Sequence, residues 1–289
     1  MKTRTLSSKA FAKINLELEV IGKRDDGYHN ISTIFQSVNL ADIVTLKITD
    51  GDCISIKTDG AIIDGENLAT KAAKLFLDKT NITARVEITL KKQIPLSAGL
   101  AGGSADAAAV LFLLNTAFDD PLSTKELLNL ALTLGADVPF CLLGGTYLAK
   151  GIGEKLTQQN YIGDYDVVLI KHHKKGSTGE MYSKIDTLDI PHLRDSDSLI
   201  PHISSGLHKL SPTLSHNSFL YASNDQKEQE DICKSLLEKG AFLSGLSGSG
   251  PTVFGLFQAL PNGLIDSLKE IYKEVYTCKT SPVGIKIIE

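Results

Sequence analysis

Hydrophobic and polar residues alternate without a break over Ala12–Val20, whose sequence is AKINLELEV. Alternation with a period of two is typical of a β-strand whose two faces differ in polarity. The apolar residues share one face of this strand, and the other face carries Lys13, Asn15, Glu17 and Glu19. The pattern therefore predicts a half-buried strand near the start of the chain.

Strand and helix patterns are mixed through the rest of the first half. Two strand-like runs, IVTLKIT and CISIKT, flank the turn Asp50–Asp52, which predicts a β-meander. Apolar residues at helical spacing predict a helix over Asn67–Lys79, and ARVEITL returns to alternation. A second helix is predicted over Ala105–Asn115 with Ser104 as its N-cap, and a capping box at Ser123–Glu126 opens a third. These elements indicate a mixed arrangement, not a βαβαβ repeat.

A change in composition near residues 157–164 is the candidate boundary between two domains, at residues 1–160 and 161–289. In the second domain, DVVLIKHH, AFLSGL and TVFGLF have the character of strands, and VGIKII closes the chain as another. Helical faces are predicted around residues 232–237 and over residues 265–275. The resulting order β-α-β-β-α-β is that of a ferredoxin-like domain.

Composition and charge disfavour several classes of protein. The 289 residues carry a net charge of -4 with no long run of Lys or Arg, so no nucleic-acid partner is expected. No apolar stretch approaches the length of about 18 residues that suggests a membrane span, so no membrane partner is expected. The four cysteines lie far apart and form no CxxC pair, which disfavours a zinc site and a disulfide scaffold. A reduced, cytoplasmic setting fits this composition.

Small residues dominate Gly99–Ser104, directly before the predicted helix. Glycines permit close approach of the backbone, and a helix start directs free N–H groups and the positive end of the helix dipole at the same point. The segment is therefore a candidate phosphate site, although a tight turn before a buried helix would use the same residues. It matches neither G-x-x-x-x-G-K-[ST] nor G-x-G-x-x-G in a βαβ unit, which disfavours a Walker kinase and a dinucleotide enzyme.

Lys13 and Asn15 lie about 7 Å apart on the polar face of the first strand, and Asp137 follows the end of a predicted helix. Phosphoryl transfer to an alcohol requires an oriented acceptor oxygen, removal of its proton and compensation of charge on the transferred group. A carboxylate beside a lysine supplies these functions, so the three residues are a candidate catalytic set. A solvated strand lysine and an aspartate in a turn or cap are the alternative interpretation.

Two further segments have both a binding and a purely structural interpretation. In the segment Asp26-Gly27-Tyr28-His29, the two rings could stack on a nucleobase and contact its polar edge, or the segment is simply a turn. Ser247–Gly250 could approach ligand phosphates as a second loop of small residues, or could connect a β-hairpin. Each segment becomes informative only in combination with the other motifs.

Four segments, taken in order, closely resemble the sequence blocks of the GHMP kinase superfamily: AKINLELEVIGKRDDGYHNIST, PLSAGLAGGSADAAA, LGADVPFCLLGGTYLAKGIGE and SGSGPTVFGLF. The DGYH segment together with AKINL is similar to the branch whose substrate is a cytidine-diphosphate sugar alcohol. The resemblance implies an α+β fold with an N-terminal ribosomal-protein-S5-domain-2-like domain, a C-terminal ferredoxin-like domain and an active site between them. Residues 174–224 are hard to align with the family.

The same resemblance implies an ATP-dependent kinase that phosphorylates the 2-hydroxyl of a cytidine-diphosphate methylerythritol, a small-molecule substrate, on the way to isoprenoid precursors. Lys13 and Asp137 would be the catalytic pair, with Asp137 taking the proton from that hydroxyl. The residues implied to bind substrate are Asn15, Tyr28, His29, Asp137 and Thr178. Mg²⁺ would accompany ATP, with no metal site formed by the protein alone. The chain is expected to be a monomer or a weak homodimer.

ATP is expected along one continuous segment. By the resemblance, its phosphates would be wrapped by Pro95, Leu96, Ser97, Ala98, Gly99, Leu100, Ala101, Gly102, Gly103, Ser104 and Ala105, with Asn67 near the adenine. Two other hypotheses stay open at this point. One is another GHMP kinase that acts on a small alcohol without a base, and the other is a nucleotide-binding homologue that has lost catalysis.

Overall fold

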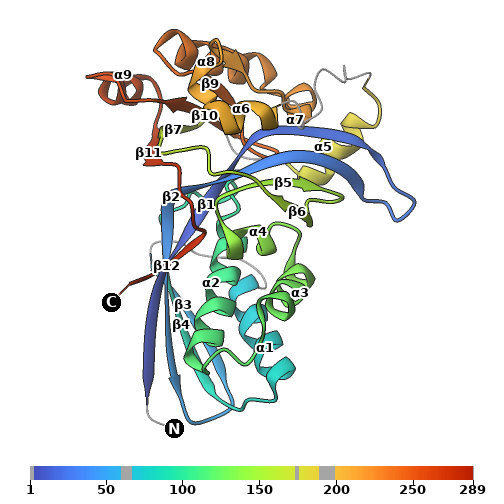
Figure 1. Ribbon diagram of the computed structural model, residues 1–289, viewed down its shortest axis with the longest axis vertical. Coiled ribbons are helices and arrows are strands. Elements are labelled where there is room, and N and C mark those ends of the chain that lie inside the picture. Colours follow the sequence, from blue (N-terminus) through green and yellow to red (C-terminus); the bar gives the residue numbers. More distant parts are fainter. Residues whose placement is uncertain (1–2, 60–66, 173–175, 189–198, 289) are drawn as a thin grey trace.

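The computed structural model describes residues 3–59, 67–172, 176–188 and 199–288. Over these residues the chain forms two sheets, each with its own helices, and one long hairpin reaches from one unit to the other (Figure 1). The hairpin consists of β1 (Arg4–Lys23) and β2 (His29–Thr49), which pair antiparallel. Residues of this hairpin contribute to the hydrophobic cores of both units, so the hairpin fixes one unit against the other.

Within the described residues, the first unit is a seven-stranded sheet with helices α1 to α4 (Figure 1). The main path of the sheet has the order β12-β1-β2-β4-β3, and β5 and β6 extend it from β2. The remaining strands are β3 (Ile54–Asp59), β4 (Arg85–Lys91), β5 (Thr146–Lys150), β6 (Lys155–Gln158) and β12 (Ile285–Ile288). The helices are α1 (Leu68–Thr80), α2 (Gly102–Ala117), α3 (Thr124–Leu134) and α4 (Val138–Leu143).

β1 is buried on both faces, which corrects the prediction of a half-buried strand. On its apolar face, Ile14 and Leu16 belong to the core of the first unit and Leu18 belongs to the core of the second. On its polar face, Asn15 and Glu17 are also buried, because the second unit packs against this stretch of β1. The alternation therefore locates the strand correctly but understates its burial.

β3 does not continue a meander from β2, contrary to the prediction. It pairs parallel with β4, and β4 pairs antiparallel with β2. β2 has no free edge for β3 along this stretch, since β1 and β4 occupy its two sides. After the turn at Asp50–Asp52 the chain therefore passes to the outer edge of β4, where the carbonyl of Cys53 accepts from Val86 N at 2.8 Å.

The helix after the glycine loop begins earlier than predicted. α2 starts at Gly102, and its N-cap is Ala101 with a left-handed φ of 58°, so Ser104 lies in the first turn and is not the cap. The first helical residue lies close to Ile94, since a Cβ on Gly102 would lie 3.1 Å from Ile94 Cγ2. The capping box at Ser123–Glu126 is confirmed at the start of α3.

Within the described residues, the second unit is a five-stranded sheet with the order β11-β7-β10-β9-β8. Its strands are β7 (Asp166–Lys171), β8 (Thr213–Leu214), β9 (Leu243–Leu246), β10 (Thr252–Phe257) and β11 (Glu274–Lys279). Its helices are α5 (Thr178–Ile185), α6 (Ile200–Ser205), the 3₁₀ helix η2 (Leu207–Lys209), α7 (Ser218–Ala222), α8 (Gln226–Glu238) and α9 (Leu264–Ile271). The succession β7, α8, β9, β10, α9, β11 is ferredoxin-like, which confirms the predicted fold class.

The end of the chain differs from the prediction. α9 ends at Ile271, and Val275, which was predicted on its face, lies in β11. The VGIKII segment does not close the second sheet but forms β12, which pairs antiparallel with β1 in the first sheet. The crossing is fixed at Ser281, whose N–H donates to Ser37 O at 2.8 Å. The predicted boundary falls between β6 and β7, but β12 returns to the first sheet, so the domain limits stay a prediction.

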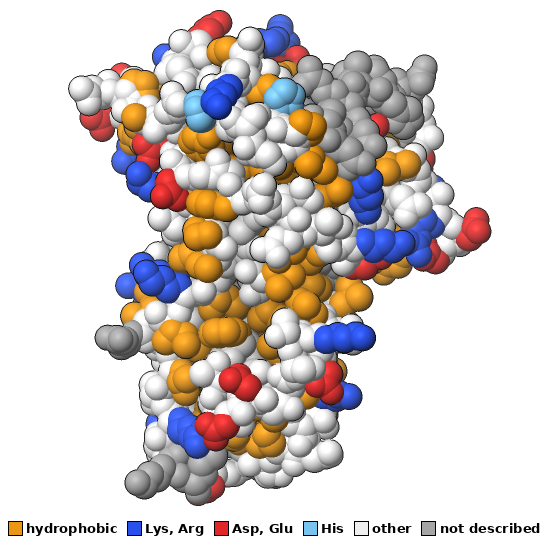
Figure 2. All heavy atoms as spheres, viewed as in Figure 1, with side chains coloured by type: hydrophobic (Ala, Val, Ile, Leu, Met, Phe, Trp, Pro, Cys, Tyr) orange, Lys and Arg blue, Asp and Glu red, His pale blue; other side chains and the backbone are white. Residues whose placement is uncertain are grey.

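No helix in the described parts of the chain is long and apolar enough to cross a membrane. On the face shown in Figure 2, Lys and Arg are interspersed with Asp and Glu, and hydrophobic side chains gather over the middle of the molecule. The polar stretch at residues 174–224 lies partly outside the described residues, and its described part contains α5, α6 and α7.

Candidate active site

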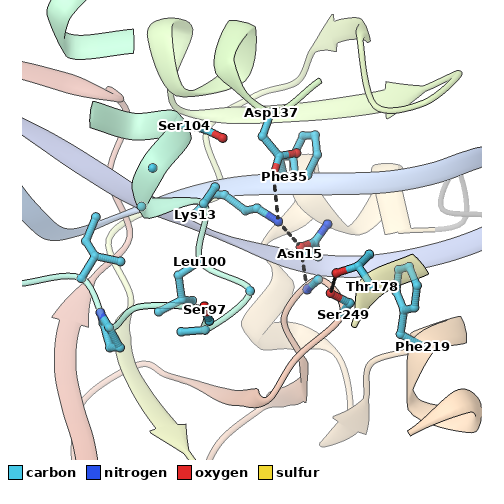
Figure 3. A pocket seen from close by; sticks show the side chains of 18 of the residues that line it. Lys13, Asn15, Phe35, Ser97, Leu100, Ser104, Asp137, Thr178, Phe219 and Ser249 are labelled. Atoms are coloured by element: carbon cyan, nitrogen blue, oxygen red, sulfur yellow. Dashed lines mark hydrogen bonds and ion pairs between the residues drawn. The ribbon is translucent and has the colours of Figure 1, made fainter. Parts of the chain in front are cut away.

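A cavity of about 420 Å³ lies between the two units, beside β1 (Figure 3). The glycine loop and the start of α2 form one side of it, and residues of the second unit form another. Its polar lining outside the glycine loop includes Lys13, Asn15, Asp137, Thr178 and Ser249. Side chains predicted from separate parts of the sequence therefore meet in one place.

The glycine loop has a backbone that requires small residues. Gly99 has a φ of 75°, and a Cβ there would lie 2.2 Å from Ser247 O, so a larger residue does not fit. Ser97 and Ala101 also have left-handed φ values, of 52° and 58°. The loop leads into α2, whose first turn lines the cavity and offers free N–H groups and a positive dipole end. This arrangement suits a phosphate group.

The structure brings most of the predicted ATP-binding residues to the cavity. Those that line it are Pro95, Leu96, Ser97, Ala98, Gly99, Leu100, Ala101, Gly102, Gly103 and Ser104. Ala105 is buried behind the loop, with its N–H bonded to Ala101 O at 2.9 Å. Asn67 caps α1 by accepting from Ala69 N at 2.8 Å, and the neighbouring Leu68 lies 3.9 Å from the Cβ position of Gly103. Asn67 therefore stands beside the start of α2, outside the cavity lining.

Lys13 and Asp137 converge in the cavity from β1 and from the start of α4 (Figure 3). Lys13 Nζ lies 3.8 Å from Asp137 Oδ2 and 5.1 Å from the centre of the Phe35 ring. The Lys13 side chain is 6% exposed and the Asp137 side chain 36% exposed. Asp137 sits at the N-cap position of α4 without making a capping hydrogen bond, so its carboxylate is free to accept a proton from a ligand.

Asn15 holds Lys13 in place. Asn15 Oδ1 accepts from Lys13 Nζ at 2.7 Å and from Gly248 N at 2.9 Å, and its Nδ2 donates to Thr33 Oγ1 at 2.8 Å. Figure 3 shows the first two of these contacts. Asn15 therefore lies in the cavity as predicted, and its amide orients the lysine.

Ser247–Gly250 connects the antiparallel strands β9 and β10, which was one of its two predicted interpretations, and it lies against the glycine loop. Its approach to ligand phosphates stays a prediction. Ser247 Oγ donates to Gly99 O at 3.0 Å. Asn217 Nδ2 donates to Leu246 O at 2.8 Å and to Gly248 O at 3.0 Å. Asn217 therefore holds this turn through two hydrogen bonds, and the turn lies close to both Lys13 and the glycine loop. Asn217 belongs to the stretch that is hard to align.

A second cavity of about 450 Å³ adjoins the first and shares Ile152, Thr178 and Tyr182 with it. Tyr28 and His29 line this second cavity as neighbours, with Tyr28 62% exposed and His29 buried. The imidazole of His29 stacks on Tyr182 with ring centres 4.5 Å apart. The cavity thus offers aromatic surfaces next to the phosphate site.

Thr178 stands between the two cavities. It is the first residue of α5, and its hydroxyl lies 2.9 Å from Ser249 Oγ. Two adjoining cavities therefore contain all the residues predicted for catalysis and substrate binding, namely Lys13, Asn15, Asp137, Thr178, Tyr28 and His29.

Comparison with known proteins decides the family. Residues 67–145 match the model of the GHMP kinases N terminal domain, and residues 209–274 match that of the GHMP kinases C terminal domain. A 4-diphosphocytidyl-2-C-methyl-D-erythritol kinase of Clostridium tetani is 42% identical over 277 residues, which cover 94% of this chain and 99% of the relative. The kinase of the same name from Thermoanaerobacter pseudethanolicus is 39% identical, covering 99% of this chain and 100% of the relative. The chain belongs to this family of GHMP kinases.

Solved structures agree with this placement. A crystal structure of 4-(cytidine 5'-diphospho)-2C-methyl-D-erythritol kinase superposes with a TM-score of 0.77 at 28% identity, covering 95% of this chain and 99% of the other. The homoserine kinase of Cytophaga hutchinsonii has a TM-score of 0.72 at 19% identity, covering 98% of this chain and 97% of the other, and shows the shared fold alone. As a GHMP kinase, the protein is an ATP-dependent phosphotransferase.

Sequence reasoning missed two residues of the second cavity of this GHMP kinase, Tyr182 and Asp186. Both come from α5 and its C-cap, in the polar stretch at residues 174–224, where no helix was predicted. One signal was present, because Ser177 and Glu180 have the spacing of a capping box and Ser177 Oγ accepts from Glu180 N. Recognition of that helix start would have placed Tyr182 and Asp186 four residues apart on one helical face.

Sequence reasoning also missed a buried ionic cluster of this GHMP kinase beneath the glycine loop. Lys92 Nζ donates to the carboxylates of Asp42 and Asp106, and Asp42 Oδ1 accepts from Gln93 N at 2.6 Å and Ile94 N at 2.8 Å. Burial raises the pKa of the Asp106 carboxyl to about 7, although Lys92 opposes the shift. Burial alone would lower the pKa of Lys92, but Asp106 and Asp42 raise it. The cluster anchors the chain at the entrance to the glycine loop.

Proposed function

We propose that this GHMP kinase transfers the γ-phosphoryl group of ATP to the 2-hydroxyl of 4-diphosphocytidyl-2-C-methyl-D-erythritol, in the route to isoprenoid precursors. The observation that carries the proposal is the convergence of Lys13 and Asp137 beside a glycine loop that leads into a helix start. The names of the relatives support the choice of substrate. The adjoining cavity with Tyr28 and His29 supports a base-bearing substrate.

ATP binds with its phosphates against the glycine loop. The N–H groups at the start of α2 would donate to the phosphate oxygens, and the helix dipole would favour their negative charge. Gly99 allows the loop to pass close to Ser247, so the second unit holds the loop in shape. The base of ATP lies toward the Asn67 end of the site, beside the start of α1.

The acceptor alcohol lies between Asp137 and the γ-phosphorus. Its 2-hydroxyl oxygen forms a bond to that phosphorus while the bond from phosphorus to the β,γ-bridging oxygen breaks, and ADP leaves. The hydroxyl proton passes to the carboxylate of Asp137, which has no capping bond to give up. The ammonium of Lys13, oriented by Asn15, offsets negative charge on the transferred group.

Mg²⁺ fits the oxygen donors at this site. The described residues contain no group of three or more His, Cys, Asp or Glu side chains that could hold a metal ion in the absence of a bound nucleotide. Mg²⁺ usually keeps several waters and binds one or two protein oxygens together with substrate phosphates. The hydroxyl of Ser104, which lines the cavity at the start of α2, is the protein donor we propose, together with oxygens of the ATP phosphates. When bound with ATP, the ion supplies positive charge to the phosphates.

The setting and the assembly remain proposals as well. All four cysteines are free, which suits a reducing cytoplasm. We retain the prediction of a monomer or weak homodimer, and sedimentation over a range of protein concentrations would measure it.

An activity screen tests the proposed function. ADP formation is measured with ATP, Mg²⁺ and four acceptors in turn: 4-diphosphocytidyl-2-C-methyl-D-erythritol, mevalonate, homoserine and galactose. We expect rapid ADP formation only with the first. Faster turnover of another alcohol would favour a different GHMP kinase, and tight ATP binding without turnover of any acceptor would favour an inactive homologue.

A further inference from the structure

The second cavity contains a carboxylate that the catalytic scheme does not use. Asp186 follows the last residue of α5 and lines this cavity together with Tyr28, His29 and Tyr182. Its Oδ1 lies 2.6 Å from His29 Nε2 and its Oδ2 lies 3.1 Å from Lys23 Nζ. These contacts tie the end of α5 to the β1–β2 hairpin and hold the carboxylate in a fixed direction.

Asp186 retains capacity to accept further hydrogen bonds. An ionised carboxylate has about four acceptor positions, and the contacts from His29 and Lys23 occupy one on each oxygen. The hydrogen bond from His29 and then that from Lys23 lower the pKa of Asp186, so the group is ionised at neutral pH. Its side chain is 27% exposed, so a ligand in the cavity can reach it. The carboxylate can only accept hydrogen bonds, which suits a ligand group that donates them.

The walls around Asp186 suit a flat ring. Tyr28 is largely exposed, and Tyr182 is already stacked on His29 at the side of the cavity. A nucleobase stacks on aromatic side chains of this kind and presents its polar edge at the rim of the stack. Asp186 is the acidic side chain at this rim within the described lining.

The chemistry of a carboxylate separates the two pyrimidine bases. Cytosine carries an exocyclic amino group that donates, and carboxylates are known partners of that group. Uracil carries a carbonyl oxygen at the same position, which a carboxylate repels. Resting on the proposed function, we propose that Asp186 determines specificity for the base by accepting a hydrogen bond from the exocyclic amino group of cytosine.

Calorimetric binding of CDP and UDP in the absence of ATP tests this role. The wild-type protein should bind CDP at least about tenfold more tightly than UDP, because a hydrogen bond to a charged group contributes about that much. Asp186→Asn keeps an acceptor for His29 but adds an amide donor that suits uracil. We expect its preference for CDP to fall to about threefold or less, with ATP affinity unchanged.

Two other variants distinguish a direct hydrogen bond between Asp186 and the base from an indirect effect of Asp186 on the structure. Glu180→Gln makes the same change of carboxylate to amide on the same helix, but Glu180 lines a different cavity, so the wild-type preference should remain. Lys23→Gln removes the ion pair but leaves the carboxylate, so CDP should still be preferred. If Lys23→Gln loses the preference for CDP as completely as Asp186→Asn, the preference depends on the ion pair between Lys23 and Asp186 and not on a hydrogen bond from the base. That result would overturn the proposal.

The remaining outcomes are also decisive. An Asp186→Asn variant with the wild-type ratio of CDP to UDP affinity, or a wild-type protein that binds both equally or neither, would contradict the role of Asp186. Binding requires no turnover, so a protein that selects CDP through Asp186 but phosphorylates no acceptor would contradict only the proposed function.

Discussion

The first cavity, proposed to hold the ATP phosphates, is called the phosphate cavity below, and the second, proposed to hold the base of the acceptor, the base cavity. The two cavities adjoin each other but are formed in different ways. One wall of the phosphate cavity comes from a single continuous segment, Pro95–Ser104, which contains the glycine loop and the start of one helix. The base cavity consists of side chains from separate segments, the β1–β2 hairpin and α5. Phosphate is recognised well by backbone N–H groups, whereas a base requires rings and polar edges that only side chains supply. The glycine-loop wall of the phosphate cavity is therefore encoded locally, whereas the base cavity depends on packing between separate segments.

The largest effect is expected in the phosphate cavity, at Lys13. Lys13→Ala should lower kcat by about 10²–10⁴-fold, because it removes the charge that stabilises the transferred group and the partner of Asp137. Steady-state kinetics with both substrates would measure this loss. A kcat close to that of the wild type would show that the ammonium has no part in the chemistry.

A substitution at Gly99 tests the backbone character of the phosphate cavity. Gly99→Ala places a Cβ 2.2 Å from Ser247 O at a left-handed φ, so it should cost roughly 1–3 kcal/mol of stability and raise the KM for ATP. Gly103→Ala is the matched control, since its Cβ meets only Leu68 at 3.9 Å. Thermal unfolding should therefore show a much smaller change in Tm for the control, and equal changes would argue against the close approach.

A substitution at Tyr28 tests the side-chain character of the base cavity. Tyr28→Ala should raise the KM for the cytidine substrate about tenfold, in line with the loss of one stacked base, and leave the KM for ATP unchanged. Initial rates over a range of each substrate give both values. An unchanged KM for the acceptor would favour a GHMP kinase whose substrate has no base.

The smallest effect is expected from the buried cluster beneath the phosphate cavity. The pKa of Asp106 is raised to about 7, so the folded protein binds more protons than the unfolded chain between pH 4 and 7. Stability from this group is therefore highest at low pH and falls as pH rises toward 7, while Lys92 titrates far above this range. Asp106→Asn should flatten the dependence of the unfolding free energy on pH, removing a change of at least about 1 kcal/mol between pH 5 and 8. An unchanged pH dependence would contradict the raised pKa.

Much of the phosphate side could be predicted from sequence because its signals are local. The alternation over Ala12–Val20 placed Lys13 and Asn15 on one face, and the small residues at Gly99–Ser104 indicated the loop. Asp137 was predicted from its position after a helix and from family resemblance, and it lies near Lys13. The exact start of α2 was not predicted, because its N-cap is Ala101, which makes no side-chain capping bond that a sequence motif would reveal.

The base side could be predicted only in part because its residues meet through tertiary packing. Tyr28 and His29 were found from one short motif, but Tyr182 and Asp186 lie in a polar stretch where no helix was predicted. β12 was recognised as a strand but was assigned to the wrong sheet, since its pairing with β1 depends on which edge is free. Alternation predicts that a segment is a strand and which residues share a face, but it does not predict the strand with which that segment pairs.

The most direct test of the central claim is a single-turnover measurement of phosphoryl transfer by Asp137→Asn, with ATP and 4-diphosphocytidyl-2-C-methyl-D-erythritol both bound. The amide cannot take the hydroxyl proton, so the rate of transfer should fall by about 10²–10⁴-fold while both ligands still bind with near wild-type affinity. A transfer rate equal to that of the wild type would contradict the assignment of Lys13 and Asp137 as the catalytic pair.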